Sequence, residues 1–453
     1  MKVTAVLLAA GQGTRMKSDL PKVLHPLCGK PMLWHVLEAL KDATTERPVV
    51  IVGHGSEEVK KYLGDRAECV LQEPQLGTGH AAMQAESSLR GNTDYVIVTY
   101  ADMPLLRGET FKRLLETQRL NSGPLSLLTV IADDPRGFGR IVRKADRTVE
   151  AVVEEYVATP EQQEIRELNV GAYCFNAEWL WNALHRIRKN PKKGEYYLTD
   201  IVEIAIKDDL PVQAVVHGDF IETIGINTRI HLSEAEAALR MRINREHMLN
   251  GVSMMDPAST YIEVGVKIGR DTTLLPNTYI HGNTEIGEGN VIGPNTIIRD
   301  SRIGNRSKVL ASVMEGARIE DHVDIGPFAR LRKGAHLKSH VHMGNFGEVK
   351  DSMLAEGVKM GHFSYIGNAT IGANTNIGAG TITANFDGEK KNPTEIGEDV
   401  FIGSDTMLIA PLKLGDGART GAGAVVTKNV PEDTLVVGMP ARAIRKVERK
   451  KKG

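Results

Sequence analysis

Residues 3–24 read VTAVLLAAGQGTRMKSDLPKVL, an apolar run that passes directly into a glycine-containing turn. A short, continuous apolar run of this kind is typical of a strand buried inside a parallel sheet. Gly11 and Gly13 would let the backbone turn tightly and come close to a ligand. Backbone N–H groups at the start of a following helix could then point at a phosphate. The stretch therefore predicts a strand, a phosphate-binding loop and a helix, in that order.

The polar side chains that follow favour the same interpretation. Thr14 contributes a hydroxyl, and Arg15 a guanidinium that can bind a phosphate through two nitrogens. Lys22 adds a point charge whose place is set by Pro21. The segment differs from a dinucleotide fingerprint, because the final glycine is missing, and from a P-loop, because no GK[ST] follows. Two glycines alone also occur in ordinary turns, so other motifs have to support the phosphate loop.

The first half of the chain alternates apolar strands with amphipathic helices, from VTAVLLA through MLWHVLEALKDA and RPVVIVG to DYVIVTYADMPLL. This alternation predicts a Rossmann-like α/β fold, with a mostly parallel sheet and helices on both faces. Ligands of such folds bind at the C-terminal ends of the strands. Asp102 lies at the end of one of these strands, where a lone aspartate most often caps a helix.

From about Ile262 the sequence follows a period of six, an aliphatic residue followed by glycine or a small polar residue. In register it includes IGEGNV, IGPNTI, IGANTN and IGAGTI. Period six predicts a parallel β-helix in which each hexapeptide forms one flat side and a coil takes about 18 residues. Such a solenoid can be purely structural. The interruptions GNFGEVKDSM and ANFDGEKKNPTE indicate where a binding site would lie.

The length and composition of the chain exclude some classes of protein. The chain has 453 residues, which predicts more than one domain, and its charges cancel to a formal net charge of -1. Nothing global therefore predicts binding to nucleic acid or to an anionic membrane surface. No stretch approaches the roughly 20 apolar residues of a membrane span, so we expect a cytoplasmic protein without membrane insertion. Three cysteines without metal-ligand spacing favour a reducing compartment.

The pattern L-x-x-G-x-G-T-x-M-x-x-x-x-P-K, from Leu8 to Lys22, resembles the signature of sugar-nucleotide pyrophosphorylases. QLGTGHA at 75–81 and YADMPLL at 100–106 lie where that family would have them. Over essentially its full length the chain resembles the bacterial bifunctional N-acetylglucosamine-1-phosphate uridyltransferases and glucosamine-1-phosphate acetyltransferases. The further motifs that carry this resemblance are GPFARLRKGA, GNFGEVK, GHFSYIGNATIGANTNIGAGTITANFDG and FIGSDTMLIAP.

The resemblance implies a fold and a domain division. We expect an α/β nucleotidyltransferase domain over residues 1–227 and a linker helix over 228–250, where TRIHLSEAEAALRMRINREHMLN consists largely of helix formers. Residues 251–453 are expected to form an all-β domain, a left-handed parallel β-helix that carries the acetyltransferase. Similar β-helices are trimers that build acetyl-transfer sites between rods, so we expect a homotrimer.

In the nucleotide half, the resemblance implies binding of UDP-N-acetylglucosamine and of Mg²⁺. The implied ligand-binding residues are Leu8, Ala9, Ala10, Gly11, Lys22, Gln72, Gly77, Thr78, Tyr100, Ala101, Asp102, Gly139, Glu154, Asn169 and Asn227. Asp102 and Asn227 would share the metal ion, and Arg15 and Lys22 would act as catalytic cations. Ala101 departs from the glycine that the family commonly has there, a small change in side-chain size.

In the β-helix half, the resemblance implies that His362 is the general base that takes a proton from the sugar amine. Imidazole suits this role because its ordinary pKa lies near working pH. Asn385 would orient it through a hydrogen bond. The sugar phosphate would be bound by Arg332, Lys350, Tyr365 and Asn376. Acetyl-CoA would contact Ala379, Asn385, Phe386, Ser404 and Ala422.

The C-terminal segment VVGMPARAIRKVERKKKG departs most from that pattern. Met439 stands where the bifunctional family uses an arginine to contact coenzyme A. Arg442 or Arg445 could replace it, and a solvated basic tail is the alternative.

The predicted function is synthesis of UDP-N-acetylglucosamine for peptidoglycan and outer-envelope glycans. Acetyl-CoA would acetylate glucosamine-1-phosphate, and UTP would then uridylylate the product with release of pyrophosphate. One alternative is a pyrophosphorylase whose β-helix is regulatory. Another is a scaffold whose nucleotide domain binds without turnover, although the presence of Arg15, Lys22, Asp102 and Asn227 argues against it.

Overall fold

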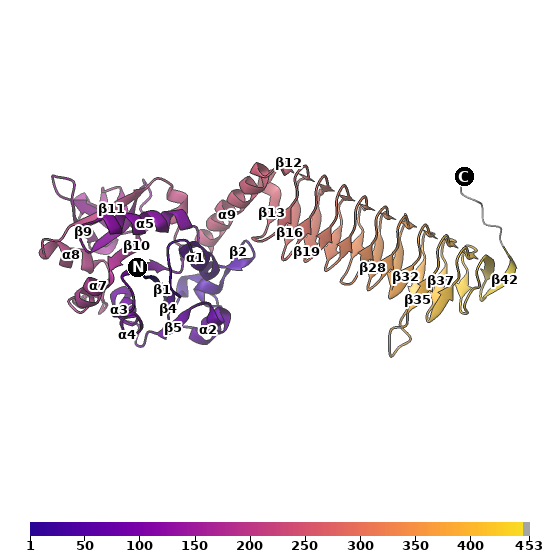
Figure 1. Ribbon diagram of the computed structural model, residues 1–453, viewed down its shortest axis with the longest axis horizontal. Helices are drawn as coiled ribbons and strands as arrows, with labels where there is room; N and C mark the ends of the chain where they lie inside the picture. Colours follow the sequence, from indigo (N-terminus) through magenta and orange to yellow (C-terminus); the bar gives the residue numbers. More distant parts are fainter. Residues whose placement is uncertain (447–453) are drawn as a thin grey trace. The chain divides into compact units, whose positions relative to one another are not determined.

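A computed structural model describes residues 1–446 of the chain (Figure 1). The chain divides into two compact units, Met1–Leu239 and Arg240–Gly453. Helix α9 (Arg229–Leu249) crosses that division. Within the described residues, no helix combines the length and the apolar composition that a membrane span requires.

The first unit is built on a mostly parallel sheet. Within residues 1–446 its order is β11-β7-β10-β6-β1-β4-β5, with the β8–β9 hairpin beside β10. These strands are β1 (Val3–Ala9), β4 (Val49–Val52), β5 (Glu68–Leu71), β6 (Tyr95–Tyr100), β7 (Leu125–Ile131), β8 (Arg140–Arg143), β9 (Val149–Val153), β10 (Glu167–Asn176) and β11 (Val212–His217). β1 is parallel to β4 and β6, whereas β10 is antiparallel to β6 and β7. The predicted α/β fold is confirmed, but the alternation of elements does not reveal the antiparallel β10 or the antiparallel β8–β9 hairpin.

Helices pack on both faces of this sheet. They are α1 (Met32–Leu40), α2 (Ser56–Leu63), α3 (Thr78–Met83), α4 (Glu86–Leu89), α5 (Gly108–Leu120), α6 (Pro160–Gln163), α7 (Ala177–Leu184) and α8 (Asp200–Lys207). Leu7 of β1 belongs to a buried cluster with Leu37 of α1 and Phe111 of α5. Its neighbour Val6 belongs to a second cluster, with Trp181 of α7. Successive side chains of a strand point to opposite faces of the sheet. Because helices cover both faces, both need apolar residues, and the apolar run of β1 is therefore unbroken.

The segment after β1 corrects one prediction. The phosphate loop is followed by two 3-10 turns, η1 (Thr14–Met16) and η2 (Lys22–Leu24), and the first α-helix starts only at Met32. Lys17 ends η1 in the left-handed conformation, with a φ of 48°. Pro21, just before η2, has no backbone N–H to donate. An α-helical hydrogen-bond ladder therefore cannot run through the loop.

The second unit is a three-sided parallel β-helix (Figure 1). Within the described residues its sides are sheets of 12, 10 and 9 strands, here called faces one, two and three, and their strands are parallel except for the last strand of face one. They begin with β12 (Ser253–Met254), β13 (Thr260–Ile262) and β14 (Lys267–Ile268), and consecutive strands move from face to face. Thr260 pairs with Thr278 and Thr278 with Thr296, so these coils take 18 residues, as the period of six predicts. Some later coils are shorter: Ile297 pairs with Val313, 16 residues on.

Aliphatic side chains at each sixth position fill the interior of the β-helix. Ile280, Ile286 and Ile292 are each at most 4% exposed. Small hydroxyl residues occupy the corners: Thr278 is buried, and its hydroxyl donates a hydrogen bond to the Leu275 carbonyl at 2.6 Å. The interior is therefore apolar, and the buried Thr278 hydroxyl at a corner has a hydrogen-bond partner.

Two features interrupt the regular coils. Ile371 pairs with Ile396, so 25 residues replace the usual coil, and the extra residues lie between β34 (Ile382–Ala384) and β35 (Thr394–Ile396). The insertion falls where the sequence indicates it. At the C-terminal end, β41 (Thr434–Gly438) and β42 (Ala441–Lys446) pair antiparallel.

The strands that carry or flank the predicted acetyl-transfer residues are β25 (Arg330–Leu331), β27 (His342–Met343), β28 (Gly347–Lys350), β30 (Lys359–Met360), β31 (Ser364–Gly367), β33 (Asn376–Ile377), β36 (Phe401–Ile402), β37 (Met407–Ile409), β39 (Arg419–Thr420) and β40 (Val425–Val426).

Candidate active sites

A cavity of about 620 Å³ opens beside the carboxyl end of β1. The loop after β1, the start of α3 and the end of β6 contribute its walls. The lining residues are Leu8, Ala9, Ala10, Gly11, Gln12, Arg15, Lys22, Val23, Gln72, Gln75, Gly77, Thr78, Ala81, Tyr100, Asp102, Glu195 and Tyr197. The predicted residues that lie outside this lining are Ala101, Gly139, Glu154, Asn169 and Asn227.

Lys22 connects three segments that are far apart in the sequence. Its Nζ forms an ion pair with Asp102 and donates a hydrogen bond to Asn227 Oδ1 at 3.2 Å. The backbone N–H of Ile226 donates to the Asp102 carbonyl at 2.9 Å, which holds the loop that carries Asn227 beside the end of β6. The two predicted metal ligands therefore converge on one cation.

The donor set at this point fits Mg²⁺. Asp102 offers a carboxylate and Asn227 an amide oxygen, both of them ligands that magnesium prefers, and both face the same ammonium group. No group of three acidic, histidine or cysteine side chains suited to a metal occurs in residues 1–446. The other ligands of a magnesium ion here would therefore be waters and phosphate oxygens.

The glycine turn shapes the phosphate side of the cavity. Gly13 has a φ of 64°, and a Cβ there would lie 2.9 Å from the Cβ of Lys22. A side chain at this position would both strain the backbone and displace Lys22. A Cβ on Gly11 would meet open space. Arg15 is exposed at the cavity, and within the described part of the chain its side chain makes no hydrogen bond or ion pair. Its guanidinium is thus available to a ligand.

The QLGTGHA motif forms another wall. Buried Gln72 donates through Nε2 to the Gly77 carbonyl at 2.9 Å. Gly77 has a φ of 96°, and a Cβ there would lie 2.6 Å from the Tyr196 carbonyl oxygen. The Thr78 hydroxyl accepts a hydrogen bond from the Leu198 backbone N–H at 3.0 Å. These contacts fasten the segment before α8 against the motif.

Tyr100 lies between the cavity and the residues predicted for the sugar. Burial raises the pKa of its hydroxyl, and the nearby charge of Glu154 raises that pKa further. Glu154 accepts a hydrogen bond from the Thr199 hydroxyl at 2.8 Å. The Asn169 backbone N–H donates to the Gly139 carbonyl at 2.8 Å, which joins the other two predicted sugar residues. Ala101 is buried and bonds only through its backbone N–H, to the Leu8 carbonyl.

In the second unit, the predicted acetyl-transfer residues lie mainly on two edges of face two. The first edge is where the chain passes from face one to face two, and it carries His362, Ala379, Ser404 and Ala422. The second edge is where the chain leaves face two for face three, and it carries Arg332, Lys350, Asn385 and Phe386. Tyr365 lies on face two itself, and Asn376 on face one.

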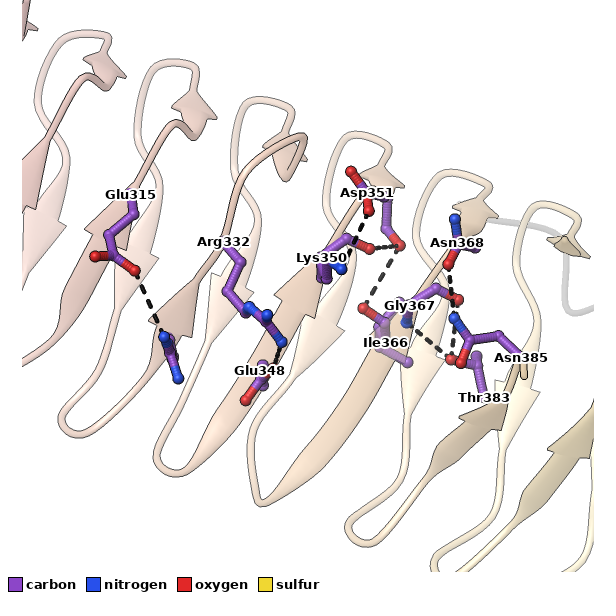
Figure 2. Close-up of polar contacts among 12 residues, drawn as sticks. Glu315, Arg332, Glu348, Lys350, Asp351, Ile366, Gly367, Asn368, Thr383 and Asn385 are labelled. Carbon is purple, nitrogen blue, oxygen red and sulfur yellow. Dashed lines mark hydrogen bonds and ion pairs between the residues drawn. The ribbon is translucent and has the colours of Figure 1, made fainter. Parts of the chain in front are cut away.

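Cationic side chains gather at the second edge. Figure 2 shows Arg332 and Lys350 on neighbouring coils; the Arg332 Nη1 lies 2.9 Å from Glu348 Oε1 and the Lys350 Nζ 3.7 Å from Asp351 Oδ2. The pKa of Lys391, on the inserted loop, is lowered mainly by the neighbouring ammonium group of Lys350 and also by the charge of Arg332. Three clustered cations with only two paired carboxylates favour binding of an anion such as a sugar phosphate.

The predicted hydrogen bond between Asn385 and His362 is not formed within one chain. Nδ1 of His362 lies 3.4 Å from Oδ1 of Asn345, on the preceding coil of the first edge. Asn385 instead donates to Oδ1 of Asn368 at 2.7 Å, on the second edge (Figure 2). A strand of face two separates the edges, and four residues of strand span roughly 13 Å. The position of each residue within its hexapeptide repeat decides on which edge it lies.

Two family models match this chain, one within each compact unit. A MobA-like NTP transferase domain matches residues 5–168, and bacterial transferase hexapeptide repeats match residues 265–300 and 393–428. The "Bifunctional protein GlmU" of Geobacillus thermodenitrificans is 48% identical over 446 residues, covering 98% of this chain and 97% of that protein. The protein of the same name from Streptococcus mutans is 45% identical over 448 residues, 99% of this chain and 98% of that one. The chain belongs to the GlmU family.

As a GlmU family member, the chain is a bifunctional enzyme of UDP-N-acetylglucosamine synthesis. Its activities are acetyl transfer to glucosamine-1-phosphate and uridylyl transfer to N-acetylglucosamine-1-phosphate. The alternatives with a regulatory β-helix or an inactive nucleotide domain are therefore set aside. Its substrates are sugar phosphates and nucleotides.

Sequence reasoning missed several residues of these GlmU sites. Gln75 lies in a quoted motif, and its Nε2 donates to the Ala10 carbonyl at 2.7 Å. Glu195 and Tyr197 reach the cavity because their segment is fastened to Gly77 and Thr78. The aromatic run EYYLTD, just before α8, was the available signal for these two. Lys391 lies in the KK pair of a recognised insertion, so its basic charge was the signal.

Proposed function

We propose that the two sites act in sequence on one sugar phosphate. The β-helix unit would transfer the acetyl group of acetyl-CoA to the amine of glucosamine-1-phosphate. The first unit would then transfer uridylyl from UTP to the product. The observation that carries the nucleotide half is the convergence of Lys22, Asp102 and Asn227 at the end of the phosphate loop.

In the uridylyl step, a phosphate oxygen of N-acetylglucosamine-1-phosphate attacks the α-phosphorus of UTP in line. The bond from the α-phosphorus to the bridging oxygen breaks, and pyrophosphate leaves. Such a reaction needs positioning and charge neutralisation more than a protein nucleophile. Lys22 inside the cavity and Arg15 at its rim supply two positive charges for the phosphates. Mg²⁺, held by Asp102 and Asn227, would supply further charge neutralisation.

In the acetyl step, the amine of glucosamine-1-phosphate attacks the thioester carbonyl carbon. A new C–N bond forms, the C–S bond breaks, and coenzyme A leaves as the thiol or thiolate. His362 would take the proton that the amine loses. The Asn345 amide oxygen only accepts, so in this contact Nδ1 of His362 would carry the proton and Nε2 would act as the base. Arg332, Lys350 and Tyr365 would bind the sugar phosphate, with Asn376.

We propose that a homotrimer completes this acetyl site. His362 and the coenzyme A residues occupy the first edge of face two, whereas Arg332, Lys350 and Asn385 occupy the second. A sugar phosphate bound at one edge would present its amine to the base only if the first edge of one chain lies beside the second edge of another. Cyclic packing of three rods brings unlike edges together in this way.

The proposed location is the cytoplasm, where UTP and acetyl-CoA are available together. Coenzyme A would run along Ala379, Ser404 and Ala422, which follow one another on successive coils. Backbone hydrogen bonds of 2.6 Å and 2.8 Å, accepted by the Ala379 and Ser404 carbonyls, keep these coils in register. Arg442 and Arg445 on β42 are exposed candidates for its phosphates.

Two assays on one purified sample test the proposal. Release of thiol from acetyl-CoA with glucosamine-1-phosphate measures the acetyl step, and release of pyrophosphate from UTP with N-acetylglucosamine-1-phosphate measures the uridylyl step. We expect His362→Ala to abolish thiol release and to spare pyrophosphate release, and Asp102→Ala to do the reverse. Loss of both reactions in either variant would contradict the assignment of one site to each unit.

A further inference from the structure

Arg229, the first residue of α9, bonds to two separate points of the segment that follows the phosphate loop, Met16 and His25. Its Nε donates a hydrogen bond to the Met16 carbonyl at 3.2 Å. Its Nη1 lies 3.2 Å from Nδ1 of His25. Arg229 also follows Asn227 by only two residues. One side chain therefore connects the loop to the segment that carries a predicted metal ligand.

The two attachment points adjoin the two catalytic cations. Met16 closes η1 and directly follows Arg15, and His25 directly follows η2, which begins with Lys22. Between η1 and η2 the chain is mostly exposed, so packing alone holds it weakly. Fixing both ends of this stretch fixes the distance from Arg15 to Lys22.

The chemistry of the His25 contact requires an arginine. A guanidinium only donates hydrogen bonds, so Nδ1 of His25 accepts and the ring is neutral. Burial lowers the pKa of His25, and the charge of Arg229 lowers it further, which keeps the ring in the accepting form. Lysine, with one donor atom on a flexible stem, cannot span Met16 and His25 as a planar fork does.

A second contact from the same helix holds the far end of the segment. Glu236 lies two turns after Arg229 and therefore on the same face of α9. Its Oε2 accepts a hydrogen bond from the Cys28 backbone N–H at 2.8 Å. The first two turns of α9 therefore hold this segment through polar contacts with Met16, His25 and Cys28.

We propose that Arg229 is a positioning residue of the uridylyl-transfer site, which sets the spacing of Arg15, Lys22 and Asn227 without touching substrate. The inference rests on the proposed roles of Arg15 and Lys22. Lys22→Ala tests those roles separately, because it should lower uridylyl transfer whether or not Arg229 acts through it.

The single variants are Arg229→Met, Arg229→Lys and His25→Leu, measured in the full-length protein. We expect each to lower kcat/KM for uridylyl transfer by about ten- to a hundredfold, because misplacement of catalytic groups by about 1 Å has effects of that size. The acetyl step is the internal control. Arg245→Met is the matched variant: it removes the same charge from the same helix, and the Arg245 side chain has no hydrogen bond or ion pair within residues 1–446.

A double-variant cycle separates positioning from general destabilisation. If Arg229 acts through Lys22, the loss in kcat/KM for Arg229→Met with Lys22→Ala should be smaller than the product of the two single losses by about tenfold. Arg245→Met combined with Lys22→Ala should show no such coupling.

Three results would overturn the inference. They are a loss below twofold in both Arg229→Met and His25→Leu, a parallel fall of the acetyl step in these variants, and independent effects in the cycle with Lys22→Ala. If Arg229→Met does not fold, the double-variant cycle of His25→Leu with Lys22→Ala tests the inference in its place. Unchanged uridylyl transfer in Lys22→Ala alone would instead refute the proposed function of the loop.

Discussion

The two units of the chain assemble their sites in opposite ways. In the first unit, Lys22 and Asn227 are 205 positions apart and still bond within one chain, because parallel strands end at one edge of the sheet. In the second unit, His362 and Asn385 are close in the sequence but lie on different edges of face two. A sheet with crossovers gathers distant residues, whereas a solenoid fixes the edge of each residue by its position in the repeat. A solenoid site that needs both edges therefore needs a second chain.

The sharpest test of this comparison mixes inactive chains. His362→Ala and Arg332→Ala are each expected to lose acetyl transfer alone. When both are co-expressed with different tags and trimers that carry both tags are purified, acetyl transfer should return to about a third of wild type, because one of the three interfaces in such a trimer pairs two intact edges.

The first unit provides the control for that experiment. A mixture of Lys22→Ala and Asp102→Ala should recover no uridylyl transfer, since these residues meet inside one chain. Recovery of uridylyl transfer there, or none of acetyl transfer in the first mixture, would remove the contrast between the two units.

Gly13→Ala should damage only the nucleotide site. The new methyl group would strain a backbone with a φ of 64° and lie 2.9 Å from the Lys22 side chain. We expect kcat/KM for uridylyl transfer to fall by about tenfold or more while acetyl transfer is unchanged. Gly91→Ala is the matched control, because Gly91 also has a positive φ, 76°, but its Cβ would meet nothing within 4 Å. If Gly13→Ala and Gly91→Ala lower uridylyl transfer equally, backbone strain is the cause and displacement of Lys22 is not.

Lys391→Met should weaken binding of the sugar phosphate at the second edge. Removal of one charge-assisted contact is expected to raise the KM for glucosamine-1-phosphate by about tenfold, with a smaller effect on kcat. Lys390→Met, one residue away on the same loop, controls for loss of charge. The prediction fails if the two variants raise this KM equally.

Asp200→Asn tests the stability of the first unit. Burial, with the charges of Glu203 and Glu154, raises the pKa of the Asp200 carboxyl from 3.8 to about 6. The folded state then binds more protons than the unfolded state between these values, so wild-type stability falls as pH rises through that window and levels off above it. Above pH 6 the variant should be more stable by about 1 kcal/mol.

Urea unfolding followed by tryptophan fluorescence measures this difference, since all three tryptophans lie in the first unit. Asp208→Asn serves as a control of opposite sign, because the pKa of Asp208 is lowered by its hydrogen bonds with Arg186. That variant should be less stable than wild type at neutral pH. If Asp200→Asn is also less stable above pH 6, the Asp200 carboxylate has a stabilising partner in solution.

Both folds follow from periodicity in the sequence. The hexapeptide period predicts the coil length because each turn must place one aliphatic residue in the interior, and the stacking of Thr260, Thr278 and Thr296 confirms it. The antiparallel direction of β10 could not be predicted, because its apolar pattern is the same in either direction. The 3-10 turns after Gly13 were missed because they depend on the left-handed backbone conformation of Lys17. That conformation is set by the folded loop, and the sequence pattern does not indicate it.

Site residues could be predicted where a sequence motif also lies at the edge of the sheet at which the parallel strands end. Asp102, Thr78 and Lys22 line one cavity because each belongs to a segment that ends at the same edge of the sheet. Tyr197 was missed because it reaches that cavity through contacts of its neighbours with Gly77 and Thr78, which no spacing reveals. The partner of Asn385 was predicted wrongly for one chain, because the positions of Asn385 and His362 within their hexapeptide repeats put them on different edges of face two.

The antiparallel hairpin at the C-terminal end of the rod limits its growth. A stack of similar parallel coils has no intrinsic length, and its last coil would offer open backbone groups to any further strand, including one from another molecule. β42 turns back along β41 and presents exposed side chains that include Arg442, Arg445 and Lys446. Like charges along a terminal strand repel a copy of themselves, so this hairpin would oppose end-to-end pairing of face one with another copy.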